Sequence, residues 1–554
     1  MSEEKIIYLL KNNRFDEAKN LIFNLLKTEK ENLKYNFYYG LTFAHEKKFV
    51  EAIEYFSIFL NKNKSDYDTN FNLANCYLGL LNFEKAIEYY ENCTRLNHNR
   101  HEPYHQVGVC YRLVRDYQKS IVNLNKALSI KENTLSYYIL GKVFRDNGQF
   151  DEARKSFEKS IFLNEKFIDS KLSLANIEND CGNYDEAFKI VNKIIQANEQ
   201  NNQVYVKSNI IIGNILKSKG DYKSAIEVNQ KILEIEPNNA DALYHLSLCY
   251  LFMKDFDNGW KYHESRYNLQ SFVLLKKIRN SFIKPIWGGN KPKKNILIYG
   301  EQGIGEQILY SQFIEVIQDQ FEKITIAVNK KLIPFFKKIY KYMEIIDYRS
   351  LENYDKYDYH LPMGSLGQFF QNLVNYNSFK KEIFYSFDNN KVPKKNKKLR
   401  CGISWKSTNK IFGKKKSIEL EQLSNLFLLN DIEFINLQYS NEKEEINILE
   451  KRINKSIFLD HKVDCFNDID GTAGLIKSCD FVITVSNSNA HIAGKLGVKT
   501  FLLLPFNDGK LWYWGLNTDN NIIWYPSIKP VRMENENDWS SCISNLNKEL
   551  ENFL

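Results

Sequence analysis

Proline and glycine are scarce in this chain, with 10 and 24 among 554 residues. So few helix breakers exclude collagen-like and proline-rich structure and favour helices. Hydrophobic residues make up 43% and charged residues 26%, which is a globular composition. At about 100–200 residues per domain, this length predicts two or more domains.

The sequence also lacks any long hydrophobic run. Its longest apolar stretches, such as Phe481–Val485 and Phe501–Leu504, are strand-sized, so no membrane span is predicted. The first residues lack a basic segment followed by an apolar core, so we expect no signal peptide. Nine cysteines without a C-x-x-C pair indicate reduced thiols in a cytoplasmic protein, not a disulfide framework or a zinc site.

The excess of positive charge is small, with 76 Lys and Arg against 68 Asp and Glu, a net charge of +8. This balance suits a small anionic ligand. Nucleic-acid binding usually requires a concentrated basic face, so no nucleic-acid partner is predicted.

A short phrase recurs along the first half of the chain, for example FVEAIEYF, FEKAIEYY and FDEARKSF. In each copy a small residue follows an aromatic residue by three positions, and the copies are 34, 34, 34, 33, 34, 38 and 34 residues apart. The small residues are Ala18, Ala52, Ala86, Ser120, Ala153, Ala187, Ala225 and Gly259. A small residue allows two helices to approach closely, and the aromatic residue fills the space between them. This period is typical of a helical repeat array.

The array resembles the tetratricopeptide repeat family over residues 1–267, with about eight repeats. The resemblance implies stacked helix pairs that form an α-solenoid with a concave groove, which usually binds a peptide or protein. Carried over from the family, Asn75, Asn176 and Asn214 are candidates to hydrogen-bond a peptide backbone in the groove. The alternative is that they are surface residues of an Asn-rich protein.

After a basic linker at 268–294 the pattern changes to short β-rich runs that alternate with amphipathic stretches. Such alternation predicts parallel sheets, here in two Rossmann-like lobes at 295–392 and 393–554, with a C-terminal helix at 538–554. A second basic connector, Lys391–Arg400, separates the lobes. Ligands of parallel sheets bind beyond the carboxyl ends of the strands. The predicted strands are 296–300, 323–328, 357–362, 399–405, 433–439, 480–486 and 498–505.

The first candidate site segment is the turn after the first of these strands. Gly303 and Gly305 permit close approach of the backbone, and Glu306 follows in the first turn of a helix whose N-terminus attracts anions. The alternative is a tight turn with a helix-capping glutamate.

Two further segments lie at strand ends in the second lobe. Ser486, Ser488 and Asn489 open a helix that carries His491, and the free amides of such a helix suit a diphosphate. Lys406, Lys416 and Ser417 follow another strand, where lysines can neutralise phosphate in place of a metal. The alternative is a solvated loop. No D-x-D-like pair accompanies these segments, so no metal and no cofactor are predicted.

In this order, GEQGIGEQILYSQF, GISWKS, KKKSIEL, SNSNAHIAGKLG, WYWG and IIWYP resemble a bacterial family that joins tetratricopeptide repeats to a heptosyltransferase-like domain. The architecture also resembles that of protein O-GlcNAc transferases. The resemblance implies a two-lobed GT-B fold, with the acceptor side in the first lobe and the nucleotide-sugar donor side in the second. Heptosyltransferases have Asp where this chain has Glu306, and the acidic residue of their D-T-G-x-x-H pattern is absent here.

The sequence therefore predicts a glycosyltransferase that uses a UDP-sugar or another nucleotide sugar and a protein or peptide hydroxyl selected by the repeats. Glu306 is the candidate base, Lys406, Lys416 and the amides near His491 would stabilise the leaving diphosphate, and the family implies inversion at the anomeric carbon. The alternative is a non-catalytic scaffold with a degenerate transferase domain.

Overall fold

The computed structural model describes residues 2–29, 32–269, 272–290, 294–351, 354–369, 398–459, 461–506, 511–515, 522–535 and 538–554. The chain divides into two compact units, Met1–Ala197 and Asn198–Leu554. The domain limits expected at 267, 294 and 392 stay predictions. Most of the second basic connector, residues 391–397, lies outside the described residues.

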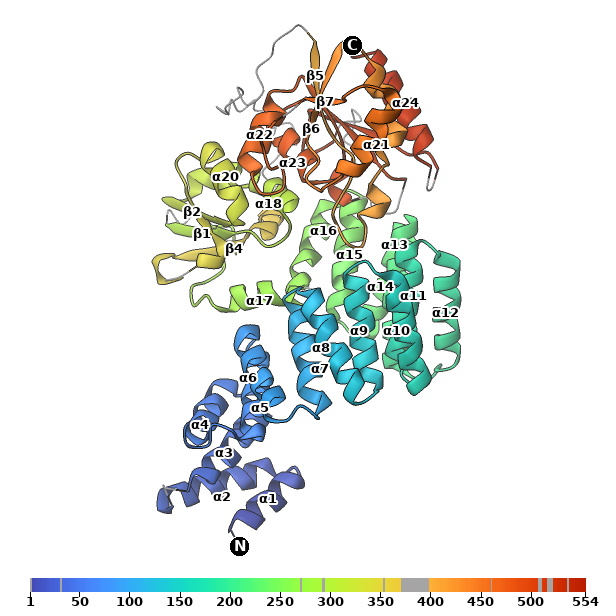
Figure 1. Ribbon diagram of the computed structural model, residues 1–554. Coiled ribbons are helices and arrows are strands. Elements are labelled where there is room, and N and C mark those ends of the chain that lie inside the picture. The colour runs from blue at the N-terminus through green and yellow to red at the C-terminus, as the bar shows by residue number, and fades with distance from the viewer. Residues whose placement is uncertain are drawn as a thin grey trace. The chain divides into compact units, whose positions relative to one another are not determined.

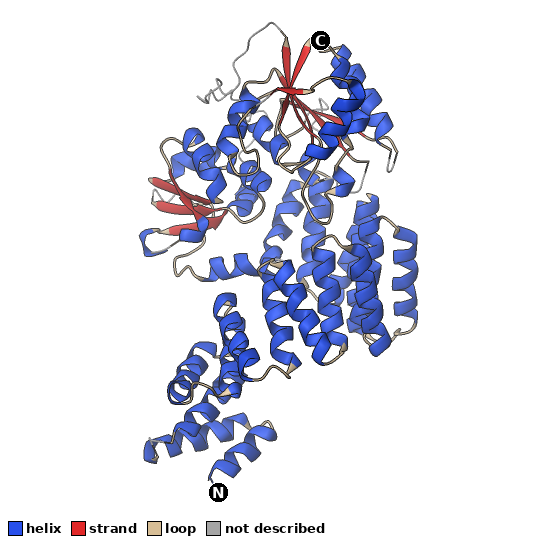
Figure 2. Ribbon diagram, in the orientation of Figure 1, coloured by secondary structure: helices blue, strands red, loops and turns tan. Residues whose placement is uncertain are grey.

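The first unit is a solenoid of antiparallel helix pairs (Figures 1 and 2). The aromatic residue of each recurring phrase is the first residue of the second helix in its pair, as Phe49 and Phe83 show. The helices are α1 (Ser2–Lys11), α2 (Phe15–Thr28), α3 (Leu33–His45), α4 (Phe49–Lys62), α5 (Tyr67–Gly79), α6 (Phe83–Leu96), α7 (His101–Leu113), α8 (Tyr117–Ile130), α9 (Thr134–Asp146), α10 (Phe150–Leu163), α11 (Ile168–Cys181) and α12 (Tyr184–Gln196).

Close helix packing explains the small residues of the repeat. Ala52 and Ala86 are completely buried. A Cβ at Gly40 would lie 2.7 Å from the ring of Phe56, so a larger residue there would force the pair apart. Each pair is therefore held by contacts that its own sequence period specifies, and the predicted α-solenoid is confirmed.

The second unit begins with two more helix pairs and a short connecting segment. The extra length of the 38-residue repeat interval is accommodated in α13, which has 18 residues where α3 and α5 have 13. The elements are α13 (Asn202–Lys219), α14 (Tyr222–Ile235), α15 (Ala240–Phe252), α16 (Phe256–His263), η1 (Glu264–Asn268) and α17 (Val273–Asn280).

A four-stranded parallel sheet follows, in the order β3-β2-β1-β4. Helix α18 follows β1 and ends at Ser311, and the short helix α19 begins at Ile314. The elements are β1 (Asn295–Tyr299), α18 (Ile304–Ser311), α19 (Ile314–Ile317), η3 (Gln318–Gln320), β2 (Lys323–Val328), η4 (Lys330–Leu332), α20 (Ile333–Ile339), β3 (Glu344–Asp347), η5 (Tyr348–Ser350), η6 (Tyr354–Lys356), β4 (Tyr359–Pro362) and η7 (Met363–Phe369).

The second sheet has six parallel strands in the order β10-β9-β8-β5-β6-β7. Both sheets are parallel, as the alternating pattern predicts. The elements are β5 (Leu399–Ser404), η10 (Lys414–Lys416), η11 (Leu420–Leu428), β6 (Ile432–Asn436), α21 (Lys443–Ile453), β7 (Phe458–Leu459), α22 (Ile469–Lys477), β8 (Phe481–Val485), α23 (Ser488–Lys495), β9 (Thr500–Leu504), η12 (Trp512–Trp514), β10 (Ile528–Arg532) and α24 (Trp539–Glu551).

The core of the second unit joins the last repeat to the sheets. Trp260 of α16 is buried and makes edge contacts with Tyr310, Phe313 and Trp512 at ring-centre distances of 6.3, 6.3 and 5.5 Å. In the part of the chain that the structure describes, no helix has the length and apolarity needed to cross a membrane.

Candidate functional site

The first element of the site is the turn between β1 and α18. Gly303 is the residue that caps α18, and Glu306 lies in the first turn of this helix. The hydroxyl of Tyr513, from η12, donates to Glu306 Oε1 at 3.3 Å. The turn therefore presents a half-buried carboxylate at the carboxyl end of β1, as expected from the sequence.

The second element is the N-terminus of α23, which follows the fully buried strand β8. Asn487 caps this helix, and its Oδ1 accepts a hydrogen bond from the amide of Asn489 at 3.0 Å. His491 is 3% exposed, and its Nδ1 lies 3.0 Å from the hydroxyl of Tyr525. Burial lowers the pKa of His491 to about 3, and the charge of Lys416 adds to the lowering. His491 is therefore a neutral imidazole at pH 7.

Gly305 brings these two elements together. A Cβ at Gly305 would lie 2.6 Å from Cδ2 of His491, so the imidazole ring packs directly on the backbone of α18. Glu306 is the next residue along. The structure thus places the first turns of α18 and α23 side by side, although 186 residues separate Gly305 from His491 in the sequence.

Lys416, in η10, is the third element. Its side chain belongs to a residue that is only 6% exposed, and no described residue makes a hydrogen bond or ion pair with its ammonium group. Burial lowers the pKa of Lys416, and the negative charge of Glu306 opposes this effect. Lys416 therefore lies close enough to Glu306 and His491 for its charge to affect both residues, and none of the described residues pairs with its ammonium group.

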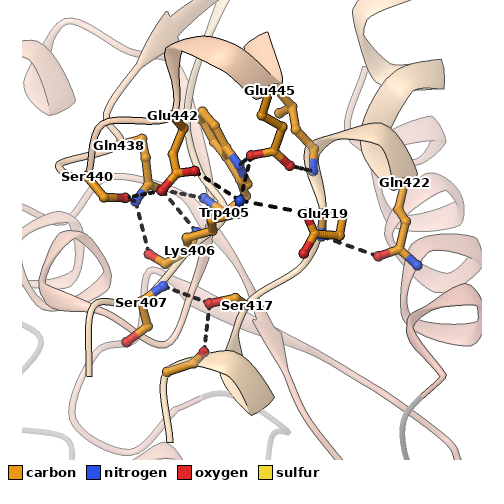
Figure 3. Close-up of polar contacts among 12 residues, drawn as sticks. Trp405, Lys406, Ser407, Ser417, Glu419, Gln422, Gln438, Ser440, Glu442 and Glu445 are labelled. Atoms are coloured by element: carbon orange, nitrogen blue, oxygen red, sulfur yellow. Dashed lines mark hydrogen bonds and ion pairs between the residues drawn. The ribbon is translucent and has the colours of Figure 1, made fainter. Parts of the chain in front are cut away.

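Lys406 occupies a different environment, which Figure 3 shows. Its ammonium lies 2.8 Å from Glu445, 3.0 Å from Glu442 and 3.6 Å from Glu419. Burial alone would lower the pKa of Lys406, but hydrogen bonds to Glu445 and Glu442 outweigh it and raise that pKa. In this conformation the charge of Lys406 is neutralised by carboxylates. Its expected role in diphosphate binding stays a prediction.

An open cavity of about 870 Å³ lies beside this acidic cluster. Its lining includes Lys406, Glu419, Glu442, Glu445 and Ile448. It adjoins the carboxyl ends of β5 and β6, the edge of the sheet at which ligands bind in parallel α/β folds.

The other predicted site residues of the second lobe serve mainly in local structure. The hydroxyl of Ser417 accepts from the amide of Ser407 at 2.9 Å and donates to the carbonyl of Gly413 at 2.7 Å, which closes the lysine loop. Ser486 accepts from the indole of Trp514 at 2.9 Å. Asn489 donates to the carbonyl of Leu437 at 2.7 Å. Ser488, at the first position of α23, is partly exposed.

Aromatic residues that the sequence reasoning did not assign to the site form its wall. The ring centre of His491 lies 5.2 Å from that of Tyr513, 4.7 Å from Trp514 and 5.7 Å from Tyr525. All three aromatic residues are buried. The signal that could have found them is present in the sequence as the aromatic segments WYWG and IIWYP.

The three asparagines assigned to a peptide groove lie on the first helices of their repeats. Asn75 is exposed on α5 and its Oδ1 accepts from the hydroxyl of Tyr90 at 2.5 Å. Asn176, on α11, and Asn214, on α13, are half-buried. Asn75 and Asn176 belong to the first unit and Asn214 to the second. Their expected role in peptide binding stays a prediction.

Comparison with known families identifies the repeats. Residues 4–68 match the tetratricopeptide repeat family, and 67–99, 135–167 and 206–239 match a second profile of the same description. The first 250 or so residues are therefore tetratricopeptide repeats that form a helical solenoid, as the 34-residue period predicts. Such repeats bind other proteins.

A curated relative extends over more of the chain. Protein FlbA of Caulobacter vibrioides is 25% identical over 327 residues, which is 53% of this chain and 52% of FlbA. The chain thus spans about half the length of this relative.

Solved structures resemble parts of the chain. One is a tetratricopeptide repeat protein from Parabacteroides merdae, 19% identical, covering 45% of this chain and 97% of its own, with a TM-score of 0.38. Another is MamA, 23% identical, covering 29% of this chain and 94% of its own, with a TM-score of 0.28.

Proposed function

We propose that the second unit is a metal-independent glycosyltransferase that uses a nucleotide sugar. The observation that carries this proposal is Lys416, a lysine buried without a partner among the described residues, beside His491 and the N-terminus of α23. A buried ammonium is costly unless an anion pairs with it. A bound diphosphate would supply that anion, and its remaining oxygens could accept from the free amides of the helix N-terminus.

The second chemical requirement is a base on the opposite side of the reacting carbon. Glu306 lies in the first turn of α18, which packs against α23 through Gly305. In the proposed reaction Glu306 takes the proton of the acceptor hydroxyl as its oxygen attacks the anomeric carbon. The bond from that carbon to the diphosphate breaks, and the leaving group departs towards Lys416 with its electron pair.

The tetratricopeptide repeats suggest the class of acceptor. Because such repeats bind proteins, we propose that they select a protein or peptide hydroxyl for transfer. A second candidate function is a non-catalytic scaffold. The same repeats favour it, and so do the ion pairs of Lys406 with three carboxylates, which neutralise a lysine expected to bind the diphosphate.

A labelling experiment separates the two candidates. The protein is incubated with acid-precipitable protein acceptors and a panel of radiolabelled nucleotide sugars. The transferase proposal predicts that one donor labels protein, that Lys416→Met abolishes most labelling, and that Lys414→Met does not. Lys414 is the matched control because it is exposed in the same 3-10 turn. If the wild-type chain labels protein from none of the donors, the transferase proposal is refuted and the non-catalytic scaffold is favoured.

A further inference from the structure

The end of the repeat array carries a buried arginine that contacts the site turn. Arg266 lies in η1, directly after α16, and is completely buried. Its Nε and Nη2 donate to both oxygens of Glu301, at 3.1 and 2.9 Å. The side chain of Glu301 is 1% exposed. Glu301 is part of the turn between β1 and α18, so this two-pronged ion pair joins the last repeat to the turn that precedes Glu306.

Every nitrogen of the guanidinium has an acceptor. Nη1 donates to the carbonyl of His263 at 3.0 Å and to Glu264 at 2.8 Å, and Nη2 also donates to the hydroxyl of Ser365 at 2.8 Å. Ser365 in turn donates to Glu264 at 2.6 Å. Three chain segments, around residues 264, 301 and 365, therefore meet at the guanidinium of Arg266. Their acceptors fix its orientation.

The backbone closes over this ion pair without spare room. A Cβ at Gly364 would collide with the carboxylate of Glu301, so only glycine fits there. The hydroxyl of Tyr267 lies 3.2 Å from Glu301 Oε2. Glu301 is thus fixed by packing as well as by charge.

The far side of the same turn is anchored by Gln307. Its Nε2 donates to the carbonyl of Gln302 at 2.8 Å, and its Oε1 accepts from the amide of Asn329 at 3.0 Å. The turn from Gly300 to Gly305 is therefore held between Gln307 on one side and Arg266 on the other. The contacts of Gln307 and Arg266 with the turn therefore determine the position of Glu306, the residue that follows it.

A buried ion pair is weak evidence for stability, because the cost of removing both charges from water offsets most of their attraction. Arg266 and Glu301 specify one arrangement of three segments, which an apolar pair could not do. We propose that Arg266 is a positioning residue that sets the conformation of the Gly300–Gly305 turn and thereby the location of Glu306. Its effect on transfer rests on the proposed function, whereas its effect on the turn does not.

The test replaces the ion pair by an apolar pair of similar length, Arg266→Met with Glu301→Met, in the full chain. Glu264 keeps its access to solvent in this variant, because its side chain is 33% exposed. A buried ion pair exchanged for apolar residues usually costs little stability. Hydrogen exchange is measured at the amides of Gly300 and Gln307, which donate to Ala327 and Gly303. UDP binding and sugar transfer are measured on the same samples.

We expect melting close to that of the wild type, at least about tenfold faster exchange in the turn, and a transfer rate reduced about tenfold or more at unchanged UDP affinity. The matched control is Arg145→Met with Asp180→Met, a partly buried ion pair of the first unit in which Arg145 Nε lies 2.5 Å from Asp180 Oδ2. It should leave exchange in the turn unchanged.

Wild-type exchange in the turn of the double variant would overturn the inference. Should the double variant fail to fold, Arg266→Lys decides, because lysine keeps the charge but cannot bind both oxygens of Glu301 in the same way. Faster exchange in the turn of that variant supports positioning, and unchanged exchange refutes it. A wild-type chain that transfers no sugar refutes the proposed function alone, since the exchange result still stands.

Discussion

Lys416→Met should stabilise the protein without ligand and weaken its binding of a nucleoside diphosphate. Lys416 is 6% exposed and has no acceptor for its ammonium among the described residues. Methionine keeps the length of the side chain and removes the charge. Removing an uncompensated buried charge is expected to raise the free energy of unfolding by about 1–3 kcal/mol, with the charge of Glu306 reducing the gain.

A bound nucleoside diphosphate should reverse the order of stability and make the wild type more stable than Lys416→Met. A charge-assisted hydrogen bond contributes about 1.5–3 kcal/mol, so its loss should weaken diphosphate binding about ten- to a hundredfold. The assay is urea unfolding with and without UDP or another nucleoside diphosphate, on the wild type, Lys416→Met and the exposed control Lys414→Met. The control should lie within about 0.5 kcal/mol of the wild type in both conditions.

The pH dependence gives a further check on the same variant. Burial lowers the pKa of Lys416 below its usual value near 10.5, so the unfolded chain binds more protons between the lowered pKa and about 10.5. Stability of the wild type relative to Lys416→Met should therefore rise with pH in that window. A Lys416→Met chain that is less stable than the wild type without ligand, and that binds diphosphate equally well, would refute the reasoning.

Three other predictions concern the site and the division of the chain. His491→Asn should lose less stability on acidification than the wild type. The unfolded chain protonates His491 near pH 6.5, whereas the folded chain, with a pKa of about 3, does not, so the wild type loses up to about 3 kcal/mol of its free energy of unfolding between pH 6.5 and 4. Acid unfolding curves of the two proteins that coincide would contradict this. Glu306→Gln should reduce single-turnover transfer at least about a hundredfold and leave diphosphate affinity near that of the wild type, and a rate within about threefold would exclude Glu306 as the base. Residues 198–554 alone should fold and bind the diphosphate, whereas removal of 1–267 should cause aggregation, because it deletes Trp260 from the core; calorimetric melting of both fragments checks this, and a stable shorter fragment would show that the last repeat is dispensable.

The repeat array could be predicted in detail because its information is local. The 34-residue period predicts the helix pairs of the array and the small residues, such as Ala52, at the contacts within each pair. Short edge strands escaped prediction for physical reasons. β10 contains Pro530, which argues against a strand interior, and β7 has two residues.

The candidate site was harder to predict because its chemistry depends on distant partners. Lys406 and Lys416 lie ten residues apart in the sequence, and each is followed by a serine. Only the fold places Lys406 against Glu442 and Glu445 of the segment after β6, and leaves Lys416 buried without a described partner. The pairing of Arg266 with Glu301 likewise joins residues 35 positions apart across two kinds of structure.

The order of the strands and their ends was nevertheless enough to predict where a candidate anion site lies, and the binding of an anion there stays a prediction. Parallel strands must deliver their carboxyl ends to one edge, and the cap residues after β8 identify a helix N-terminus there. The sequence could not reveal that Gly305 would bring α18 into contact with His491, because that contact depends on how the two sheets and their helices pack.

The most direct test of the central claim is calorimetric titration of the full chain with a panel of nucleoside diphosphates. We expect one site, micromolar affinity for at least one nucleotide, and loss of that affinity in Lys416→Met but not in Lys414→Met. Absence of binding by every nucleoside diphosphate at millimolar concentration, from a chain shown to be folded, would contradict the claim that Lys416 and the N-terminus of α23 hold the donor diphosphate.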